Sequence, residues 1–113
     1  MKTQLYNYKA KIISVYDGDT VRMDISLGFN NWLLNQSVRL FGINTPEIRG
    51  SQKLDGLISR DRLRELIDGK EIILESHKDK TGKFGRILGT IYLDGVNINE
   101  LLVREKLAVR YLP

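Results

Sequence analysis

The chain has 113 residues and a net charge of +4, from 18 Lys and Arg against 14 Asp and Glu. This length suits one domain with a modest core, and the mild positive charge is compatible with a polyanionic partner without requiring one. The absence of cysteine excludes disulfides and thiolate metal sites. Residues 1–8 lack the apolar core of a signal peptide, and no apolar run approaches transmembrane length. We expect a single domain over residues 1–113 that is cytoplasmic as the sequence is written; a secreted mature domain would look the same.

Two segments near the N-terminus alternate apolar with polar residues, the pattern of strands with one buried face. The apolar positions are Tyr6, Tyr8, Ala10 and Ile12 in the first segment and Val21, Met23, Ile25 and Leu27 in the second. Gly18 lies between the segments and predicts a turn, because glycine supplies the positive φ that such turns need. A third strand is predicted through Val38, Leu40 and Ile43, and Pro46 ends it.

The middle of the chain contains a helix followed by strands. The helix is predicted over 54–67, with Gly69 at its C-terminal end. Strands are predicted over 72–74 and 87–93. The three arginines of the helix, at positions 60, 62 and 64, are interpreted as a solvated face. His77 is interpreted as part of an exposed loop, without a ligand set around it.

The last segment predicts a hairpin and a short helix. Asp94-Gly95 is a hairpin turn signal, and Asn99 predicts the cap of a helix from residue 100 to about 106. Five short strands with two helices favour a five-stranded OB-fold Greek-key barrel, a β-barrel with helices of the α+β class. The pattern alone also allows an α+β sandwich.

Three short segments carry side chains that suit metal and phosphate chemistry. They are Asp-Gly-Asp-Thr at 17–20, the stretch from 39 to 47, and Lys-Phe-Gly-Arg at 83–86. Carboxylate oxygens bind hard cations, and the planar guanidinium of Arg donates two parallel hydrogen bonds to a phosphate. A phosphodiester in hydrolysis gains negative charge, so a catalyst needs cationic groups around it and a group that positions or deprotonates water. Each segment alone is typical of a turn or a solvated strand end; together they indicate phosphodiester chemistry.

The order of these motifs resembles the staphylococcal nuclease (thermonuclease) family. The resemblance is carried by residues 16–21, 38–47 and 84–86, and by the tail segments 91–95, 99–100, 102–104 and 107–108. It covers nearly the whole chain, from about residue 8 to residue 111. It implies an OB-fold barrel with packed helices that hydrolyses DNA and RNA with Ca²⁺.

By motif position, the resemblance also implies roles for individual residues. The implied catalytic trio is Arg39, Glu47 and Arg86. The implied Ca²⁺ ligands and their supporting carboxylate are Asp19, Asn44, the backbone carbonyl of Thr45 and, in support, Asp17. Nucleic acid is expected across the barrel face that bears the two arginines, with edge contacts from Lys83, Phe84 and Tyr111.

Two features depart from the family pattern. Asn44 stands where the family usually places a second ligating Asp. Unit charges about 4 Å apart interact by roughly 4 kcal/mol at an effective dielectric near 20, so the missing charge is expected to weaken Ca²⁺ binding by tenfold or more. The chain also stops at Pro113, where the staphylococcal enzyme continues into another helix and a second Tyr at the nucleotide.

The leading hypothesis is a Ca²⁺-dependent nuclease that cleaves single-stranded or locally melted DNA and RNA with little sequence specificity and leaves 3′-phosphates. No membrane or protein partner is implied. The alternative is a nucleic-acid-binding OB-fold module with weak or lost catalysis, which Asn44 and the short C-terminus favour and the retained Glu47 opposes. A third reading, a protein-interaction module, needs neighbouring domains that this sequence does not contain.

Overall fold

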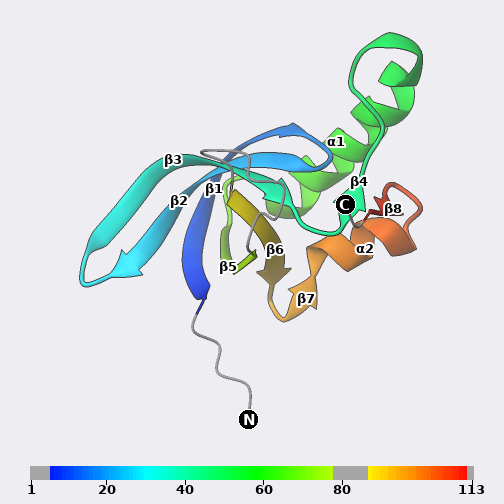
Figure 1. Ribbon diagram of the computed structural model, residues 1–113. Coiled ribbons are helices and arrows are strands. Elements are labelled where there is room, and N and C mark those ends of the chain that lie inside the picture. Colours follow the sequence, from blue (N-terminus) through cyan, green and yellow to red (C-terminus); the bar gives the residue numbers. More distant parts are fainter. Residues whose placement is uncertain (1–5, 78–86, 112–113) are drawn as a thin grey trace.

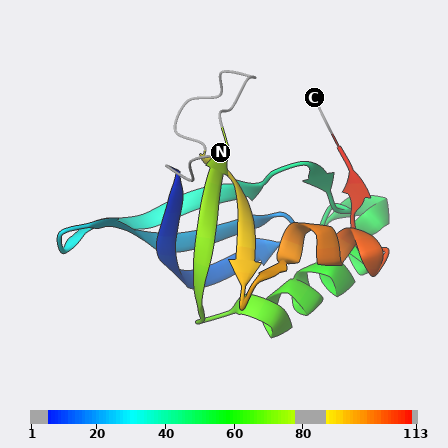
Figure 2. The same ribbon diagram turned by 90° about the horizontal axis from the view of Figure 1, so that it is seen from below.

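The computed structural model describes residues 6–77 and 87–111, and five of its strands close into a barrel. The barrel strands are β1 (Asn7–Asp17), β2 (Thr20–Gly28), β3 (Asn31–Leu40), β5 (Glu71–His77) and β6 (Ile87–Leu93). They are ordered β3-β2-β1-β5-β6 with antiparallel neighbours, and a parallel pairing of β3 with β6 closes the ring. The predicted OB-fold barrel is therefore confirmed, and Figures 1 and 2 show it with the helices on one side.

Three short strands and two helices complete the described fold. β7 (Val96–Asn97) pairs with β6, while β4 (Ile43–Asn44) and β8 (Val109–Arg110) form a separate two-stranded antiparallel sheet. A 3₁₀ turn (Gly50–Gln52) leads into α1 (Lys53–Ile67), and α2 (Ile98–Arg104) follows β7. In the described ranges, no helix is long and apolar enough to cross a membrane.

The core fills the barrel and the space between the barrel and its helices. It follows the period-2 alternation of the strands and one face of each helix. Burying each large apolar side chain contributes about 1.5–3 kcal/mol. The largest buried apolar side chains are Ile12, Val21, Met23, Val38, Leu40, Leu63, Ile67, Leu74, Ile91, Ile98 and Leu102.

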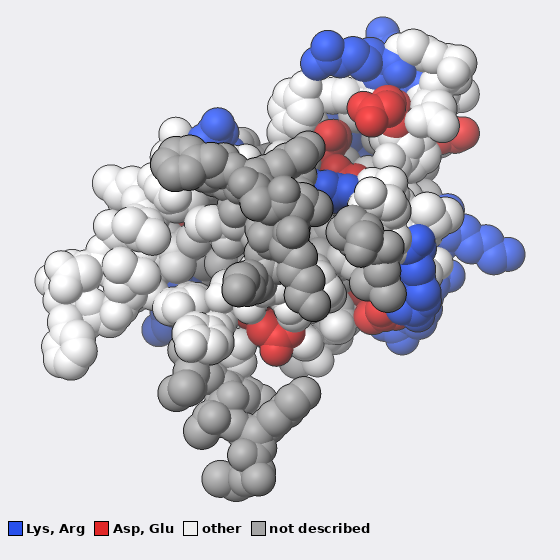
Figure 3. All heavy atoms as spheres, viewed as in Figure 1, with Lys and Arg blue, Asp and Glu red and all other residues white. Residues whose placement is uncertain are grey.

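The third strand differs from its prediction. β3 begins at Asn31, well before Val38, and forms a long hairpin with β2 across the two-residue turn Phe29-Asn30. It also ends at Leu40, because Gly42 takes a φ of +78° and turns the chain before Ile43 starts β4. The far end of the hairpin projects from the barrel, and its surface in Figure 3 is uncharged, whereas charged side chains gather over the helical side.

Both helices lie within two residues of their predicted bounds, but the residue that caps α2 was predicted wrongly. α1 stops before Gly69, whose φ of +73° suits a helix C-terminus. The cap of α2 is Asn97 rather than Asn99: the Asn97 side chain accepts a hydrogen bond from the backbone N–H of Glu100. The two Asn residues are equivalent as sequence signals, but Ile98 between them is buried, and the helix starts two residues earlier than predicted.

Two interpretations of polar side chains also change. His77 is the last residue of β5, and its ring stacks on Phe41 with centroids 4.0 Å apart, so it does not lie in a loop. The arginines of α1 are not a uniformly solvated face. Arg62 forms an ion pair with Glu105, at 2.8 Å, and Arg64 donates to the backbone carbonyl of Val15, at 3.1 Å.

Candidate functional site

The turn between β1 and β2 packs tightly against the segment after β4 and against α1. A Cβ atom at Gly18 would lie 2.8 Å from the Thr45 side chain and 2.9 Å from Cβ of Ser59. The predicted reason for this glycine is wrong, because Gly18 is not among the described glycines with a positive φ. Its role is close approach: without a side chain here, the turn carrying Asp19 can sit directly on Thr45.

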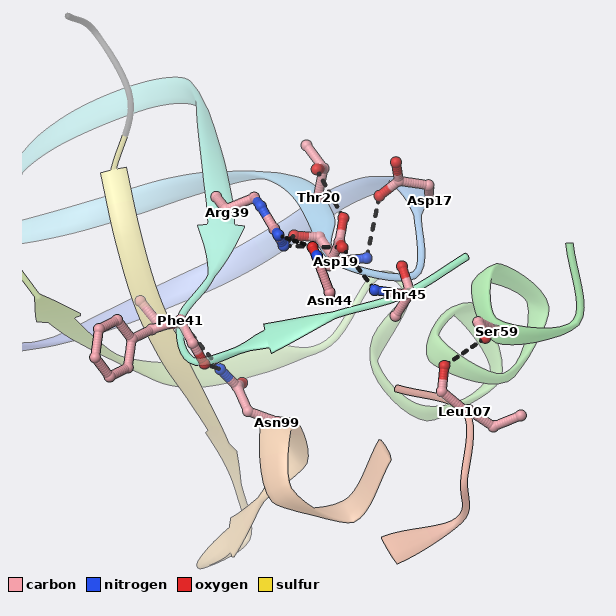
Figure 4. Close-up of polar contacts among 11 residues, drawn as sticks. Asp17, Asp19, Thr20, Arg39, Phe41, Asn44, Thr45, Ser59, Asn99 and Leu107 are labelled. Carbon is pink, nitrogen blue, oxygen red and sulfur yellow. Dashed lines mark hydrogen bonds and ion pairs between the residues drawn. The ribbon is translucent and has the colours of Figure 1, made fainter. Parts of the chain in front are cut away.

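Asp19 is the centre of the site and is only 8% exposed. One carboxylate oxygen, Oδ2, accepts the backbone N–H of Thr45 at 3.0 Å and pairs with Nη1 of Arg39 at 2.9 Å. The other, Oδ1, accepts from the Thr20 hydroxyl at 3.4 Å. Figure 4 shows these groups meeting at Asp19, in the turn before β2, from β2, from β3 and from the segment after β4.

Arg39 links Asp19 to Asn44. The register of β2 and β3 places Thr20 opposite Arg39, which brings the arginine to the start of β2 beside Asp19. The Nη2 atom of Arg39 donates to Oδ1 of Asn44 at 2.5 Å. The guanidinium therefore lies between a carboxylate oxygen and an amide oxygen, and both oxygens face one cationic group (Figure 4).

Asp17 supports the turn from the end of β1. Its Oδ1 accepts the backbone N–H of Asp19 at 3.0 Å. Burial, and then the charge of Asp19, raise the pKa of Asp17 to about 6. The two carboxylates thus have different environments: Asp19 has a guanidinium partner, whereas Asp17 has a backbone N–H and a neighbouring negative charge.

Glu47 is exposed and lines a pocket of about 350 Å³ together with Asn44 and Thr45. Its backbone N–H donates to Gln52 at 3.2 Å, but its carboxylate has no partner among the described residues. The Thr45 hydroxyl is buried and also lacks a partner in the described part of the chain. Within residues 6–77 and 87–111, the Glu47 backbone is thus held by Gln52 while its exposed carboxylate faces the pocket without a protein partner.

Two residues that position this site were not identified from the sequence. A Cβ atom at Gly56 would lie 2.1 Å from the backbone oxygen of Glu47, so this glycine lets α1 press against that backbone. The hydroxyl of Ser59, which is 1% exposed, donates to the Leu107 carbonyl at 2.7 Å. A glycine inside a helix is unfavourable for the helix itself, and that cost is the sequence signal for a packing role.

Tyr111 follows β8, which pairs with β4 so that Val109 lies opposite Asn44. Its backbone N–H donates to the Gly42 carbonyl at 2.8 Å, and its side chain is 46% exposed. The remaining predicted residues, Lys83, Phe84 and Arg86, lie outside the described residues. The structure thus brings together Asp17, Asp19, Arg39, Asn44, Thr45 and Glu47, and it places Tyr111 directly after β8, the strand that pairs with β4.

The oxygens around Arg39 suit a hard divalent cation chemically, because carboxylate, amide and backbone carbonyl oxygens are its preferred ligands. Asp19 and Asn44 already converge on the Arg39 guanidinium. No group of three or more His, Cys, Asp or Glu side chains arranged for a metal occurs in the described ranges. A cation here would need neutral oxygens and water as additional ligands, and it would compete with Arg39 for Asp19.

Comparison with known proteins places the chain in a family. The family model described as staphylococcal nuclease homologue matches residues 37–112, a range that includes Arg39, Asn44 and Glu47. An uncharacterized protein of Bacillus anthracis is 31% identical over 106 residues, 89% of this chain and 46% of the relative. The SPbeta prophage-derived endonuclease YokF and the endonuclease YncB, both of Bacillus subtilis, are each 31% identical over 96 residues, 81% of this chain.

The chain spans 30% of the length of YokF and 43% of that of YncB, less than half of each of these relatives. The family match nevertheless covers more than half of this chain and runs from the last four residues of β3 through both helices and β8. The barrel, its closure and the motif order agree with that match. The chain belongs to the staphylococcal nuclease homologue family.

Proposed function

We propose that this protein is a Ca²⁺-dependent nuclease that hydrolyses phosphodiester bonds of DNA and RNA. The observation that carries the proposal is the cluster in which Arg39 lies between Asp19 and Asn44, with the exposed Glu47 in the pocket that Asn44 also lines. This set contains the cationic group, the oxygen ligands and the base that phosphodiester hydrolysis requires. The names of two relatives, both endonucleases, support the same reaction class.

Each side chain has a proposed role at the scissile phosphate. Glu47 accepts a proton from the attacking water, since its carboxylate is exposed to the pocket. Arg39 exchanges its bond to Asp19 for a bidentate contact with the phosphate, where it stabilises the growing negative charge. Arg86 is the proposed second arginine, which favours departure of the 5′-oxygen and so yields 3′-phosphate ends.

The proposed Ca²⁺ ligands are Asp19, the Asn44 side chain and the Thr45 carbonyl, supported by Asp17. When bound, Ca²⁺ supplies a positive charge that holds a phosphate oxygen. Arg39 donates to an oxygen of Asp19 and to one of Asn44 in this structure, so these oxygens are already oriented toward a cationic group. Lys83, Phe84 and Tyr111 are proposed to contact the nucleotide beyond the scissile phosphate, in single-stranded or locally melted substrate.

A second candidate is a nucleic-acid-binding module without catalysis. One observation favours it: Arg39 neutralises Asp19 directly, so the site is electrostatically satisfied without a divalent cation. A binding module, however, has no use for a free carboxylate at position 47 facing an anionic ligand.

Digestion of denatured DNA separates the two candidates. The wild-type chain should cleave it in 10 mM Ca²⁺ and lose this activity with chelator. Glu47→Gln should lower the rate about 10²- to 10⁴-fold while leaving DNA affinity equal or slightly higher, because it removes a base and a negative charge together. Wild-type protein that binds the DNA but leaves it intact under these conditions would decide for the binding module.

A further inference from the structure

A second, basic hollow lies between α1 and the strands β1, β2 and β3. It encloses about 530 Å³, and three arginines line it: Arg22 from β2, and Arg60 and Arg64 from α1. The remaining lining residues are small, polar or aromatic, and none is acidic. We call this region the arginine hollow. It is not part of the candidate site described above, although it begins beside it.

The hydrogen bonds of these arginines leave donors for a ligand. Arg22 donates one bond, to the backbone carbonyl of Asn35 at 3.1 Å, and Arg64 donates to the carbonyl of Val15. Arg60 contacts the carboxylate of Asp61 at 3.0 Å, and Arg64 reaches the same carboxylate only at 4.0 Å. A guanidinium has five N–H donors, so neutral carbonyls orient these groups without exhausting them. Three positive charges therefore face a hollow that has no carboxylate in its lining.

The hollow continues the face that carries the catalytic cluster. Thr20 lines the hollow and also donates to Asp19. On β2 and β3, Arg22 pairs with Ser37 just as Thr20 pairs with Arg39, so all four side chains lie on the outer face of the barrel. Two residues along a strand span about 7 Å, so Arg22 lies about that far along β2 from Thr20, the residue opposite Arg39.

Aromatic surface accompanies the charge. Tyr16 lines the hollow with its side chain 52% exposed, and its hydroxyl accepts from Nη2 of Arg49 at 2.9 Å. Grooves that bind single-stranded nucleic acid combine arginines that follow the backbone with exposed aromatic rings on which bases stack. The arginine hollow has both components, and the hydroxyls of Ser14 and Ser37 in its lining are further donors for a phosphate.

We propose that the arginine hollow binds the sugar–phosphate backbone of a single nucleic-acid strand next to the scissile phosphate, with Arg22 and Arg60 on the phosphates. The proposal rests on the proposed nuclease function and extends it: the strand runs from Arg39 past Thr20 into the hollow. Long strands then bind more tightly than a mononucleotide because they occupy both regions.

The test measures binding by the full chain in a Glu47→Gln background, so that bound DNA survives. Fluorescence anisotropy in Ca²⁺ over a series of salt concentrations compares a labelled twelve-nucleotide oligothymidine with a mononucleotide bisphosphate, which is too short to reach the hollow. Arg22→Gln and Arg60→Gln each remove one charge from the hollow. Arg104→Gln removes one exposed charge from α2, outside the hollow, and is the matched control.

We expect each hollow variant to weaken twelve-mer binding about three- to tenfold more than mononucleotide binding, and to lower the salt slope for the twelve-mer by about 0.7, the value for one phosphate contact on a single strand. The exposed position of Arg22 also allows the charge reversal Arg22→Glu, which should enlarge the loss. Circular dichroism of each variant checks the fold.

Two results would contradict binding in the hollow without contradicting the nuclease proposal. One is an equal loss of affinity for the two ligands, and the other is a loss of twelve-mer affinity no greater than that of Arg104→Gln. Wild-type protein that binds the twelve-mer without cleaving DNA would overturn the nuclease proposal, yet the same titration would still decide whether the hollow binds it. Wild-type protein that does not bind the twelve-mer would overturn both.

Discussion

Arg39 contacts both side chains that we propose as Ca²⁺ ligands, and this contact sets the affinity expected of the proposed metal site. Its guanidinium contacts one side-chain oxygen of Asp19 and one of Asn44. A cation entering the site must displace or share this guanidinium, and it meets only one full negative charge on these two ligands. Both factors weaken divalent binding relative to a site with two carboxylates.

Asn44→Asp should therefore tighten Ca²⁺ binding by tenfold or more, because it restores a full charge at an oxygen that already faces a cation. Isothermal calorimetry measures the affinity directly. Asn31→Asp adds the same charge on the exposed end of β3 and should leave the affinity nearly unchanged. An Asn44→Asp protein with wild-type Ca²⁺ affinity would show that this side chain is not a ligand.

Gly56 gives a second test at the scale of single residues. Replacing glycine by alanine inside a helix ordinarily stabilises it by about 1 kcal/mol. Here the new methyl group would lie 2.1 Å from the Glu47 carbonyl oxygen, so backbone must move, at a cost of about 1–3 kcal/mol. Gly56→Ala should lower both the free energy of unfolding in urea and the cleavage rate, through displacement of Glu47.

The exposed residue Ile58, on the same helix, provides the control for Gly56. Ile58→Ala should change the stability by less than about 0.5 kcal/mol, as is usual for surface positions. A stabilised Gly56→Ala protein with normal activity would mean that α1 does not set the position of Glu47.

At the scale of secondary-structure elements, Asn99 joins α2 to the barrel. It is 3% exposed; its side-chain oxygen accepts the backbone N–H of Ile91 at 3.1 Å, and its amide group donates to the carbonyls of Phe41 at 2.9 Å and Gly89 at 3.1 Å. These bonds tie the helix to β6 and to the end of β3 (Figure 4). The helix that supports β8 and Tyr111 is thereby fixed to the strand pair that closes the barrel.

Asn99→Ala should lower the free energy of unfolding by about 2–4 kcal/mol, since it removes three hydrogen bonds at once and takes this partner from the Ile91 N–H and the Phe41 carbonyl, whereas the Gly89 carbonyl keeps the Phe41 N–H. Asn97→Ala removes only the helix cap and should cost about 1 kcal/mol. Urea denaturation of the two variants measures the difference. Equal losses would mean that the buried contacts of Asn99 contribute no more than an ordinary cap.

At the scale of the whole molecule, the sequence predicts the strands and helices that bury one face in the core. The alternation of Val21, Met23 and Ile25 is visible because one face of β2 lines the barrel. The first half of β3 does not alternate in this way. Trp32, Leu33 and Leu34 are all exposed on the projecting hairpin, so neither face of this part of the strand has to be apolar. Closure of the barrel by β3 and β6 depends on pairing distant in sequence, and it was predicted through fold class rather than from any local pattern.

The candidate site was predicted in composition but not in its contacts. Motif order identified Asp19, Arg39 and Asn44, and the structure brings them together. The direct contact of Arg39 with both oxygens could not be predicted, since it depends on the register that places Thr20 opposite Arg39. Gly56 and the arginine hollow were missed for the same reason, because both arise only where α1 packs against other segments.

Metal binding at the proposed site should raise the stability of the entire barrel, because Asp19 comes from the turn before β2 and Asn44 and Thr45 come from β4 and the residue after it, two segments that are together only in the folded state. A ligand that binds only the native protein stabilises it by RT ln(1 + [L]/Kd), about 1.4 kcal/mol when Ca²⁺ is at ten times its Kd. For a domain of this size that corresponds to a rise of about 5 °C in the thermal midpoint.

We therefore expect Tm to rise with Ca²⁺ in the millimolar range, and Asn44→Asp to reach the same rise at about a tenth of the concentration or less. Potassium chloride of matched ionic strength is the control, since screening alone acts equally on all exposed charges. The Asp19–Arg39 pair is largely shielded from water, with side chains 11% and 18% exposed, so screening should affect it little. A Tm that responds identically to both salts would mean that Asp19 and Asn44 bind no Ca²⁺ in the folded protein, and that Arg39 remains their only cation.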